Sequence, residues 1–251
     1  MPLPALYPPA TPFYPQAVQR PVSYAPQAGL LDQQPRGWVL HVVVGYGSPW
    51  GTFERATSPN RRFSHLWVAK TGAVEQYAPL TSKSWAQAAG NPWWWSVETE
   101  GLPTEPLTDA QIDALAAWHV WCGAVDRVAG PQDTLWGAPG RGIVTHQDGG
   151  VAWGNHTCPG PIRAGQRPEI LRRAALIRGG SMPKFTPADL APVWASTFGA
   201  PDAQETAGQR LAEAAAVLPV AQDIAAELAD VREQLAALTR AVAALAPTPK
   251  P

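Results

Sequence analysis

The stretch Trp38-Val39-Leu40-His41-Val42-Val43-Val44 is a run of apolar residues around a single histidine. Apolar residues without alternation, rich in valine, are typical of a strand that is buried on both faces of a sheet. The run therefore predicts a strand in the middle of a sheet, with regular structure beginning at Trp38. A lone histidine in such a strand is most often a hydrogen-bonded core residue, so the meaning of His41 depends on residues elsewhere in the chain.

Two later motifs carry side chains that commonly bind metal ions. Gly142-Ile143-Val144-Thr145-His146 predicts a second strand that ends in a histidine, and Cys158-Pro159-Gly160-Pro161 begins with a cysteine. Together with His41 they supply two imidazoles and one thiolate, a donor set that leaves the fourth position of tetrahedral zinc open for water. Such a set is typical of a catalytic rather than a structural site. We therefore predict a hydrolase with Zn2+ bound by His41, His146 and Cys158.

Strands and helices alternate through the middle of the chain. Residues 65–70 and 73–77 flank Thr71-Gly72 and predict a hairpin, and residues 96–100 predict a further short strand. A helix is expected from Thr108, because Thr108 and Gln111 have the spacing of a capping box, and a second helix is expected over 168–178. This order predicts an α/β domain over residues 37–179, with a mixed β-sheet flanked by helices.

The beginning of the chain differs in composition from this domain. Residues 1–36 hold nine prolines and predict an extended N-terminal arm that is partly ordered at best. The alternative is an arm that packs along the domain through its aromatic residues, which are Tyr7, Phe13, Tyr14 and Tyr24.

The end of the chain differs as well. Residues 180–201 are expected to form a linker, and residues 202–247 a helical, coiled-coil C-terminal region. Within that region apolar residues recur in steps of four and three, at Ile224, Leu228, Val231, Leu235, Leu238, Val242 and Leu245. This spacing is the a/d seam of a coiled coil. The seam predicts either a homo-oligomer through the C-terminal helix or a helical hairpin with residues 202–218.

Composition argues against several kinds of partner. A net charge of −1 leaves no basic excess to neutralise phosphates, which argues against nucleic acid. No apolar run approaches the roughly 18 to 20 residues that span a bilayer, so no membrane insertion is expected. The start Met1-Pro2-Leu3-Pro4 lacks the basic and apolar regions of a signal peptide, which predicts synthesis as a soluble cytoplasmic product.

Five short segments together carry a resemblance to a known family. They are Val39-Leu40-His41, Ser64-His65-Leu66-Trp67-Val68, Val97-Glu98-Thr99-Glu100-Gly101, the strand that ends at His146, and His156-Thr157-Cys158-Pro159-Gly160. In this order they make residues 38–178 resemble the type 2 N-acetylmuramoyl-L-alanine amidases, the zinc fold shared with peptidoglycan recognition proteins and many phage endolysins. The resemblance implies the same three zinc ligands.

The resemblance also implies two catalytic roles. The first carboxylate of the family's short strand acts as general base, which here is Glu98. Glu100 is its nearest competitor, because both carboxylates would share one face of a strand. His156 stands where the family carries a lysine or histidine that stabilises the developing oxyanion. Ser64 departs from the members that carry tyrosine at this position, and because a serine cannot reach as far, no catalytic role is predicted for it.

Three consecutive tryptophans, Trp93-Trp94-Trp95, precede the Glu98 strand, where the resemblance implies a groove wall. Indole faces can stack on sugar rings, and a nearby amide can hydrogen-bond to a peptide. We therefore predict that Trp94, Trp95 and Asn91 bind substrate. Packing of the tryptophans in the core is an equally open alternative.

The resemblance implies that the protein cleaves the amide bond between N-acetylmuramic acid and L-alanine in bacterial peptidoglycan. Because no signal peptide is evident, we expect a phage endolysin that stays in the host cytoplasm until it is released to the cell wall and lyses the host. Three alternatives stay open. The domain could bind peptidoglycan without cutting it, or Cys158 could be the nucleophile of a cysteine peptidase with His146 as its base. The protein could also be a virion-associated structural protein organised by its coiled coil.

Overall fold

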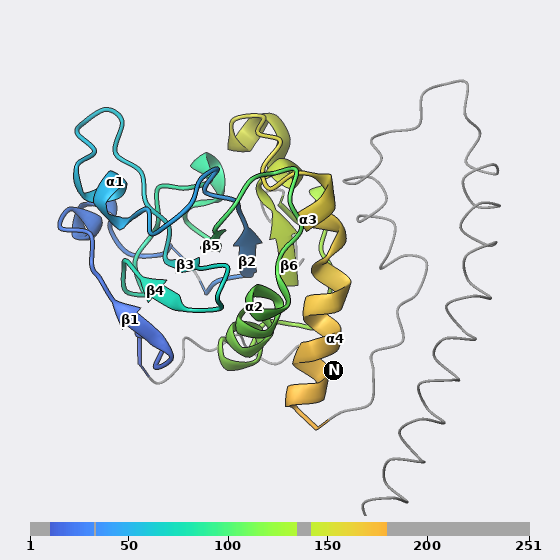
Figure 1. Ribbon diagram of the computed structural model, residues 1–251. Coiled ribbons are helices and arrows are strands. Elements are labelled where there is room, and N and C mark those ends of the chain that lie inside the picture. Colours follow the sequence, from blue (N-terminus) through green and yellow to red (C-terminus); the bar gives the residue numbers. More distant parts are fainter. Residues whose placement is uncertain (1–10, 33, 135–141, 180–251) are drawn as a thin grey trace, which may run out of the picture. The chain divides into compact units, whose positions relative to one another are not determined.

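The computed structural model describes residues 11–32, 34–134 and 142–179. The expected linker, the C-terminal helical region and Tyr7 lie outside these residues. The described residues form a six-stranded mixed sheet with helices packed on it, which confirms the predicted α/β fold (Figure 1). Within these three ranges, no helix is long and apolar enough to cross a membrane.

The sheet has the strand order β1-β4-β3-β5-β2-β6. In chain order the strands are β1 (Ala17–Gln19), β2 (Gly37–Leu40), β3 (Leu66–Val68), β4 (Val74–Gln76), β5 (Trp95–Thr99) and β6 (Gly142–Thr145). Neighbouring strands are parallel except β3 and β4, which form the expected antiparallel hairpin. β2 lies between β5 and β6 and is buried along its whole length, as its apolar sequence predicts.

The α-helices in the described part of the chain are α1 (Trp50–Glu54), α2 (Asp109–Trp121), α3 (Pro161–Gly165) and α4 (Arg167–Ile177). Short 3-10 turns are η1 (Ala25–Ala28), η2 (Ala88–Gly90), η3 (Pro131–Thr134) and η4 (His146–Trp153). α2 begins with both hydrogen bonds of the predicted capping box. The Gln111 N–H donates to Thr108 Oγ1 at 3.1 Å, and the Thr108 N–H donates to Gln111 Oε1 at 3.0 Å.

Alternate residues of the central strands face opposite layers. Trp38 and Leu40 of β2 lie in the core beneath α2 and α4, two helices that pack side by side (Figure 1). Val39 belongs instead to a second cluster, which it shares with Val144 of β6. Because side chains alternate along an extended strand, continuing this pattern to the ends of β2 and β6 places His41 and His146 on the side of Val39 and Val144.

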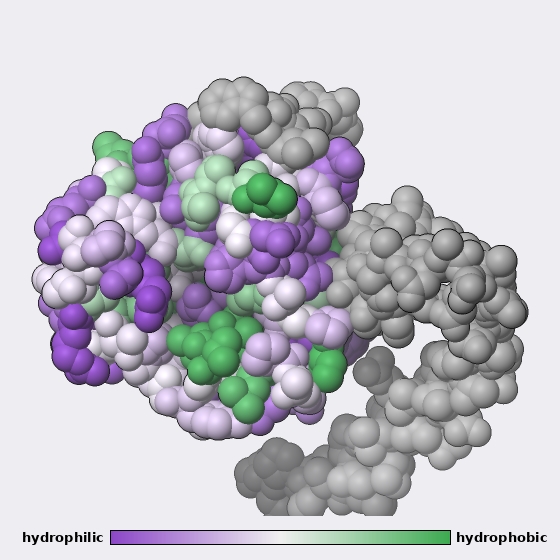
Figure 2. All heavy atoms as spheres, turned by 90° about the horizontal axis from the view of Figure 1, so that it is seen from above, coloured by the Kyte–Doolittle hydropathy of each residue, from purple (hydrophilic) through white to green (hydrophobic). Residues whose placement is uncertain are grey.

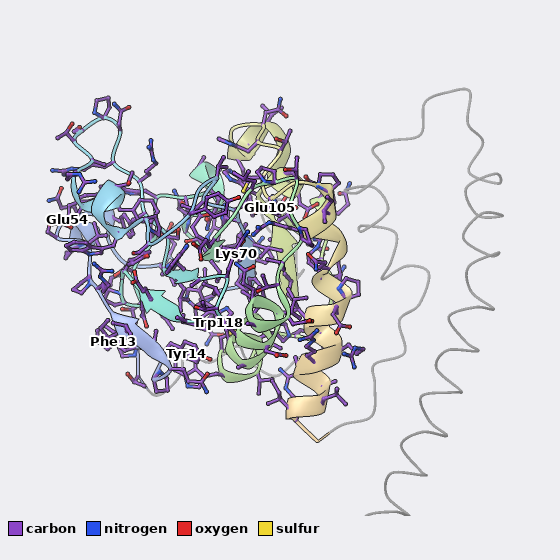
Figure 3. The ribbon with its side chains drawn as sticks, viewed as in Figure 1. Phe13, Tyr14, Glu54, Lys70, Glu105 and Trp118 are labelled. Atoms are coloured by element: carbon purple, nitrogen blue, oxygen red, sulfur yellow. The ribbon has the colours of Figure 1, made fainter. Side chains whose placement is uncertain are left out.

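The described part of the N-terminal arm packs against the domain. β1 adds a strand beside β4, and Tyr14 is buried against Trp118 and Trp121 of α2; Figure 3 labels Tyr14 and Trp118. Tyr24 is also buried, between Phe63 and Trp85, whereas Phe13 is exposed. Residues 11–32 therefore follow the packed-arm alternative, because buried aromatic rings offset the cost of ordering a proline-rich segment.

Candidate metal centre

The carboxyl ends of three parallel strands bring the chemistry-bearing side chains together. His41 follows β2 directly, His146 follows β6 directly, and Glu98 lies near the end of β5. β2 pairs in parallel with both β5 and β6, so the three strand ends meet at one edge of the sheet. In α/β sheets this edge is the usual place for a ligand site.

His41, His146 and Cys158 form a cluster at this edge. Each residue offers one ligand atom, and these three atoms all lie within 4.8 Å of one another. The two imidazole rings have centroids 4.8 Å apart, and Cys158 Sγ lies 3.8 Å from His41 Nδ1. Two imidazole nitrogens and one sulfur are a donor set that suits zinc, so the residues fit the predicted ion.

The protonation of the two histidines suits metal binding. His146 Nε2 lies 2.8 Å from the carbonyl oxygen of Trp153, which can only accept, so this nitrogen carries the hydrogen and Nδ1 keeps its lone pair. Burial lowers the pKa of His146 to about 4. Burial, and then the neighbouring His146, hold the pKa of His41 well below its usual value. Both rings are therefore neutral near pH 7, as metal ligands must be.

Cys158 lies in an environment that disfavours a free thiolate. Burial, and then the carboxylate of Glu98, raise the pKa of its thiol. The Val42 N–H donates to its sulfur at 3.2 Å. A cysteine nucleophile needs a lowered pKa or a base strong enough to take its proton, and His146 is a weak base here. The arrangement therefore favours a metal ligand over the nucleophile of a cysteine peptidase.

Glu98 and Glu100 have different surroundings. Glu98 Oε2 is inaccessible to solvent and has no hydrogen-bond partner. Burial raises the pKa of Glu98 to about 7, with the Ser64 hydroxyl opposing the shift. Both oxygens of Glu100 are occupied, because the N–H groups of Gly47 and Lys70 donate to them at 2.7 Å each. Glu98 lines the same cleft as the cluster and Glu100 does not, which favours Glu98 as the acid–base group.

His156 lies beside the cluster on the loop that leads to Cys158. Its ring stacks on His146, with centroids 4.4 Å apart and an interplanar angle of 22°. The residue is exposed and lines the cleft, so its ring can reach a bound ligand.

The cluster lies in a cleft with a volume of about 920 Å³. Its wall includes Val42, Tyr46, Phe63, Trp85 and Trp153, so a largely apolar surface surrounds a few polar groups, as in many ligand sites. Figure 2 looks onto this end of the molecule and shows hydrophobic side chains gathered among hydrophilic ones. None of these residues was predicted from the sequence to line a cleft; for Tyr46, the glycine-rich segment after the β2 run was the available signal.

Tyr46 is held at the rim of the cleft by a charged pair. Its hydroxyl donates to Glu105 Oε1 at 2.6 Å, and the other oxygen of Glu105 lies 2.9 Å from Lys70 Nζ. Figure 3 labels Glu105 and Lys70, which approach each other from separate segments. The Lys70 ammonium also lies over the Tyr46 ring, 4.8 Å from its centroid.

The structure corrects the expected substrate contacts of Trp94 and Trp95. Both side chains are fully buried and neither lines the cleft. Trp95 Nε1 donates to the Leu80 carbonyl at 2.9 Å, and Trp94 packs edge-on against Trp153. The physical reason is that β5 is an interior strand, and both of its faces are covered. Asn91 does line the cleft, but its Oδ1 accepts two backbone N–H groups, so only its Nδ2 could reach a ligand.

A mixed β-sheet flanked by helices, with two histidines, a cysteine and a buried glutamate in one cleft, defines a candidate metallohydrolase. The sequence model of the N-acetylmuramoyl-L-alanine amidase family matches residues 31–161, slightly more than half of the chain. The chain therefore belongs to this family. No match to a curated protein was found.

Solved structures of similar fold include several amidases. The N-acetylmuramoyl-L-alanine amidase LysC from Clostridium intestinale is 17% identical over 67% of this chain and 100% of its own, with a TM-score of 0.48. The Staphylococcus aureus hydrolase AmiA is 17% identical over 72% of this chain and 89% of its own, with a TM-score of 0.45. An endolysin of a Thermus scotoductus bacteriophage is 17% identical over 64% of this chain and 100% of its own, with a TM-score of 0.42.

Proposed function

We propose that the protein is a zinc-dependent amidase that hydrolyses the amide bond between N-acetylmuramic acid and L-alanine in bacterial peptidoglycan. The observation that carries the proposal is the approach of three ligand atoms to within 4.8 Å, in the cleft that Glu98, with its buried and unpartnered Oε2, also lines. His41, His146 and Cys158 would hold the ion. When bound, zinc supplies a positive charge that activates water and polarises the scissile carbonyl.

Glu98 moves the proton in this proposal. Its carboxylate accepts a proton from the attacking water and donates it to the nitrogen of the departing L-alanine, so the carboxylate is regenerated in each turnover. A carboxyl group whose pKa lies at about 7 can do both near neutral pH.

His156 is proposed to stabilise the oxyanion that develops on the lactyl carbonyl. A neutral or protonated imidazole can donate one hydrogen bond to that oxygen, and donors of this kind lower the barrier only when they are positioned beforehand. The stacking of His156 on His146 supplies that positioning. The apolar wall around Tyr46 and Trp85 offers a surface for the sugar and the stem peptide.

The first test is zinc content together with product analysis. Purified wild-type protein is expected to hold about one zinc per chain and to release stem peptides from cell walls with a free L-alanine amino group. Cys158→Ala should lose both the zinc and the activity. Cys122→Ala is the matched control, because Cys122 is buried in the core beneath α2 and is not part of the cluster.

Two outcomes would reject the proposal. Wild-type protein that binds cell walls without zinc would be a recognition module. Activity that survives removal of zinc but is abolished by alkylation of Cys158 would indicate a cysteine peptidase.

We further propose that the protein acts as a phage endolysin; its resemblance to that group supports the role. Expression in a host cell should cause lysis only when a pore-forming protein opens the cytoplasmic membrane. Detection of the protein in purified phage particles would instead support the virion-associated alternative.

A further inference from the structure

The two histidines of the cluster differ in the hydrogen bonding of their Nε2 atoms. His146 Nε2 is satisfied by the carbonyl oxygen of Trp153. His41 Nε2 is buried and has no hydrogen-bond partner. Buried polar atoms without partners are uncommon, and a metal-bound histidine usually donates its second N–H to an acceptor. His41 Nε2 therefore lacks the acceptor that a metal-bound histidine usually has.

Gln87 provides the complementary atom. Its side chain is completely buried, and its Oε1 is also without a partner. The side-chain amide of Gln87 lies within interaction distance of the His41 ring, although the two groups do not reach the geometry of a formed hydrogen bond. One buried donor and one buried acceptor thus lie near each other beside the cluster.

The orientation of the Gln87 amide is fixed by its surroundings. Its Nε2 donates to the Trp94 carbonyl oxygen at 3.0 Å. Because a carbonyl can only accept, the NH2 group must face Trp94, and Oε1 remains as the end that can accept a hydrogen bond. The backbone of Gln87 is held as well, since its N–H donates to Asn91 Oδ1 at 2.9 Å. Asn91 and Trp94 therefore support Gln87.

We propose that Gln87 is a positioning residue, whose Oε1 accepts a hydrogen bond from His41 Nε2 and so presents His41 Nδ1 to the metal. An acceptor at Oε1 selects the neutral tautomer that carries hydrogen on Nε2. The lone pair is then on Nδ1, the atom that lies 3.8 Å from Cys158 Sγ. Both histidines would bind through Nδ1, His146 oriented by a backbone carbonyl and His41 by a side chain. This inference rests on the metal site of the proposed function.

The test combines zinc affinity with the tautomer of His41 in the full-length protein. Gln87→Met has a similar length but only a weakly accepting sulfur in place of the amide oxygen, and it is expected to weaken zinc binding by about 10- to 100-fold in competition with a chromophoric chelator. Gln87→Glu keeps an acceptor for His41, and its second oxygen, when protonated, can still donate to the Trp94 carbonyl, so this variant should retain most of the affinity. Ser84→Ala is the matched control, a buried polar side chain of the same segment that does not line the cleft. NMR of isotope-labelled histidine in the zinc-loaded wild type should show hydrogen on His41 Nε2.

The outcomes separate this inference from the proposed function. Wild-type protein without zinc would overturn both. Zinc in the wild type with unchanged affinity in Gln87→Met would overturn only the role of Gln87. If Gln87→Met does not fold, the tautomer of His41 in the wild type and the zinc affinity of Gln87→Glu still test the role of Gln87. Hydrogen on His41 Nδ1, or loss of zinc affinity in Gln87→Glu equal to that of a cluster variant, would overturn the assignment.

Discussion

Glu98 and Glu100 stand two positions apart, yet their surroundings differ, and we expect their substitution to have different effects. Glu98→Gln keeps the shape of the side chain but cannot take a proton, so we expect kcat to fall by about 100- to 10,000-fold with zinc content unchanged. Glu100→Gln replaces one carboxylate oxygen by an NH2 group, so one of the two backbone N–H groups, those of Gly47 and Lys70, loses its acceptor. It should lower the melting temperature and reduce kcat far less. Steady-state kinetics with zinc analysis on both variants checks this, and equal losses of kcat would contradict it.

His65 gives the stability a dependence on pH. Its Nδ1 accepts the Ser96 N–H at 3.0 Å, its Nε2 lies 2.8 Å from the Ser82 carbonyl, and burial lowers its pKa from 6.5 to about 4. The unfolded chain therefore binds a proton near pH 6.5 that the folded protein takes up only near pH 4. The contribution to the free energy of unfolding is fully present above pH 6.5 and is lost as the pH falls towards 4.

The expected loss is on the order of 3 kcal/mol for this residue. Denaturant unfolding at several pH values measures it. The cluster histidines titrate in the same direction, so the comparison with His65→Gln isolates His65. The stability gap between wild type and variant should narrow as the pH is lowered, and a gap that stays constant from neutral pH to pH 4 would contradict the prediction.

At the scale of elements, α3 and α4 support both strand ends that carry the cluster histidines. Arg163 of α3 donates to Thr99 Oγ1 at 2.6 Å, and the Thr99 hydroxyl donates to the His41 carbonyl at 2.6 Å. Arg167 of α4 pairs with Asp148 at 3.0 Å. Two buried arginines thus connect the helices after Cys158 to the edge of the sheet.

Of the two connections, the Arg167–Asp148 ion pair is expected to contribute more to the free energy of unfolding. Both side chains are almost fully buried, and Asp148 Oδ2 also accepts from the N–H and the hydroxyl of Thr145, the residue before His146. Arg167→Met leaves a buried carboxylate without its counter-ion, which should cost about 3 to 5 kcal/mol. The double variant Arg167→Met with Asp148→Asn should recover part of that loss. Denaturant unfolding of the single and double variants tests this, and additive losses would contradict it.

Elements with local signals were predictable from the sequence, and elements made by distant contacts were not. The capping box of α2 and the apolar run of β2 are complete within a few residues, and both appear as expected. β1 is three residues long and pairs with β4. The burial of Tyr14 depends on Trp118 and Trp121 of α2, so no local pattern could distinguish a packed arm from an extended one.

At the scale of the whole molecule, the candidate site also combines features that were predictable from the sequence with features that were not. The donor residues were predictable because imidazole and thiolate are recognised by their chemistry, and the structure brings them together. The cleft wall was not predictable, since it is assembled from loops such as the one that carries Tyr46 and the segment around Trp85. Trp94 and Trp95 were predicted as wall residues because a sequence shows aromatic character but not that both faces of the strand are covered.

The coiled-coil seam, outside the described residues, leads to a prediction for the complete chain. If the seam joins copies of the protein, light scattering should give a mass above that of one chain. Replacing the seam residues Leu228 and Leu235 by aspartate should reduce the measured mass to that of a monomer, because a charge at an a/d position cannot be buried. Gln234→Asp with Thr239→Asp, off the seam, is the matched control. A monomeric wild type would instead support the helical hairpin. Cleavage of soluble fragments should be unchanged, whereas binding to intact walls should weaken in the seam variant, because linked copies bind a repeating polymer with avidity.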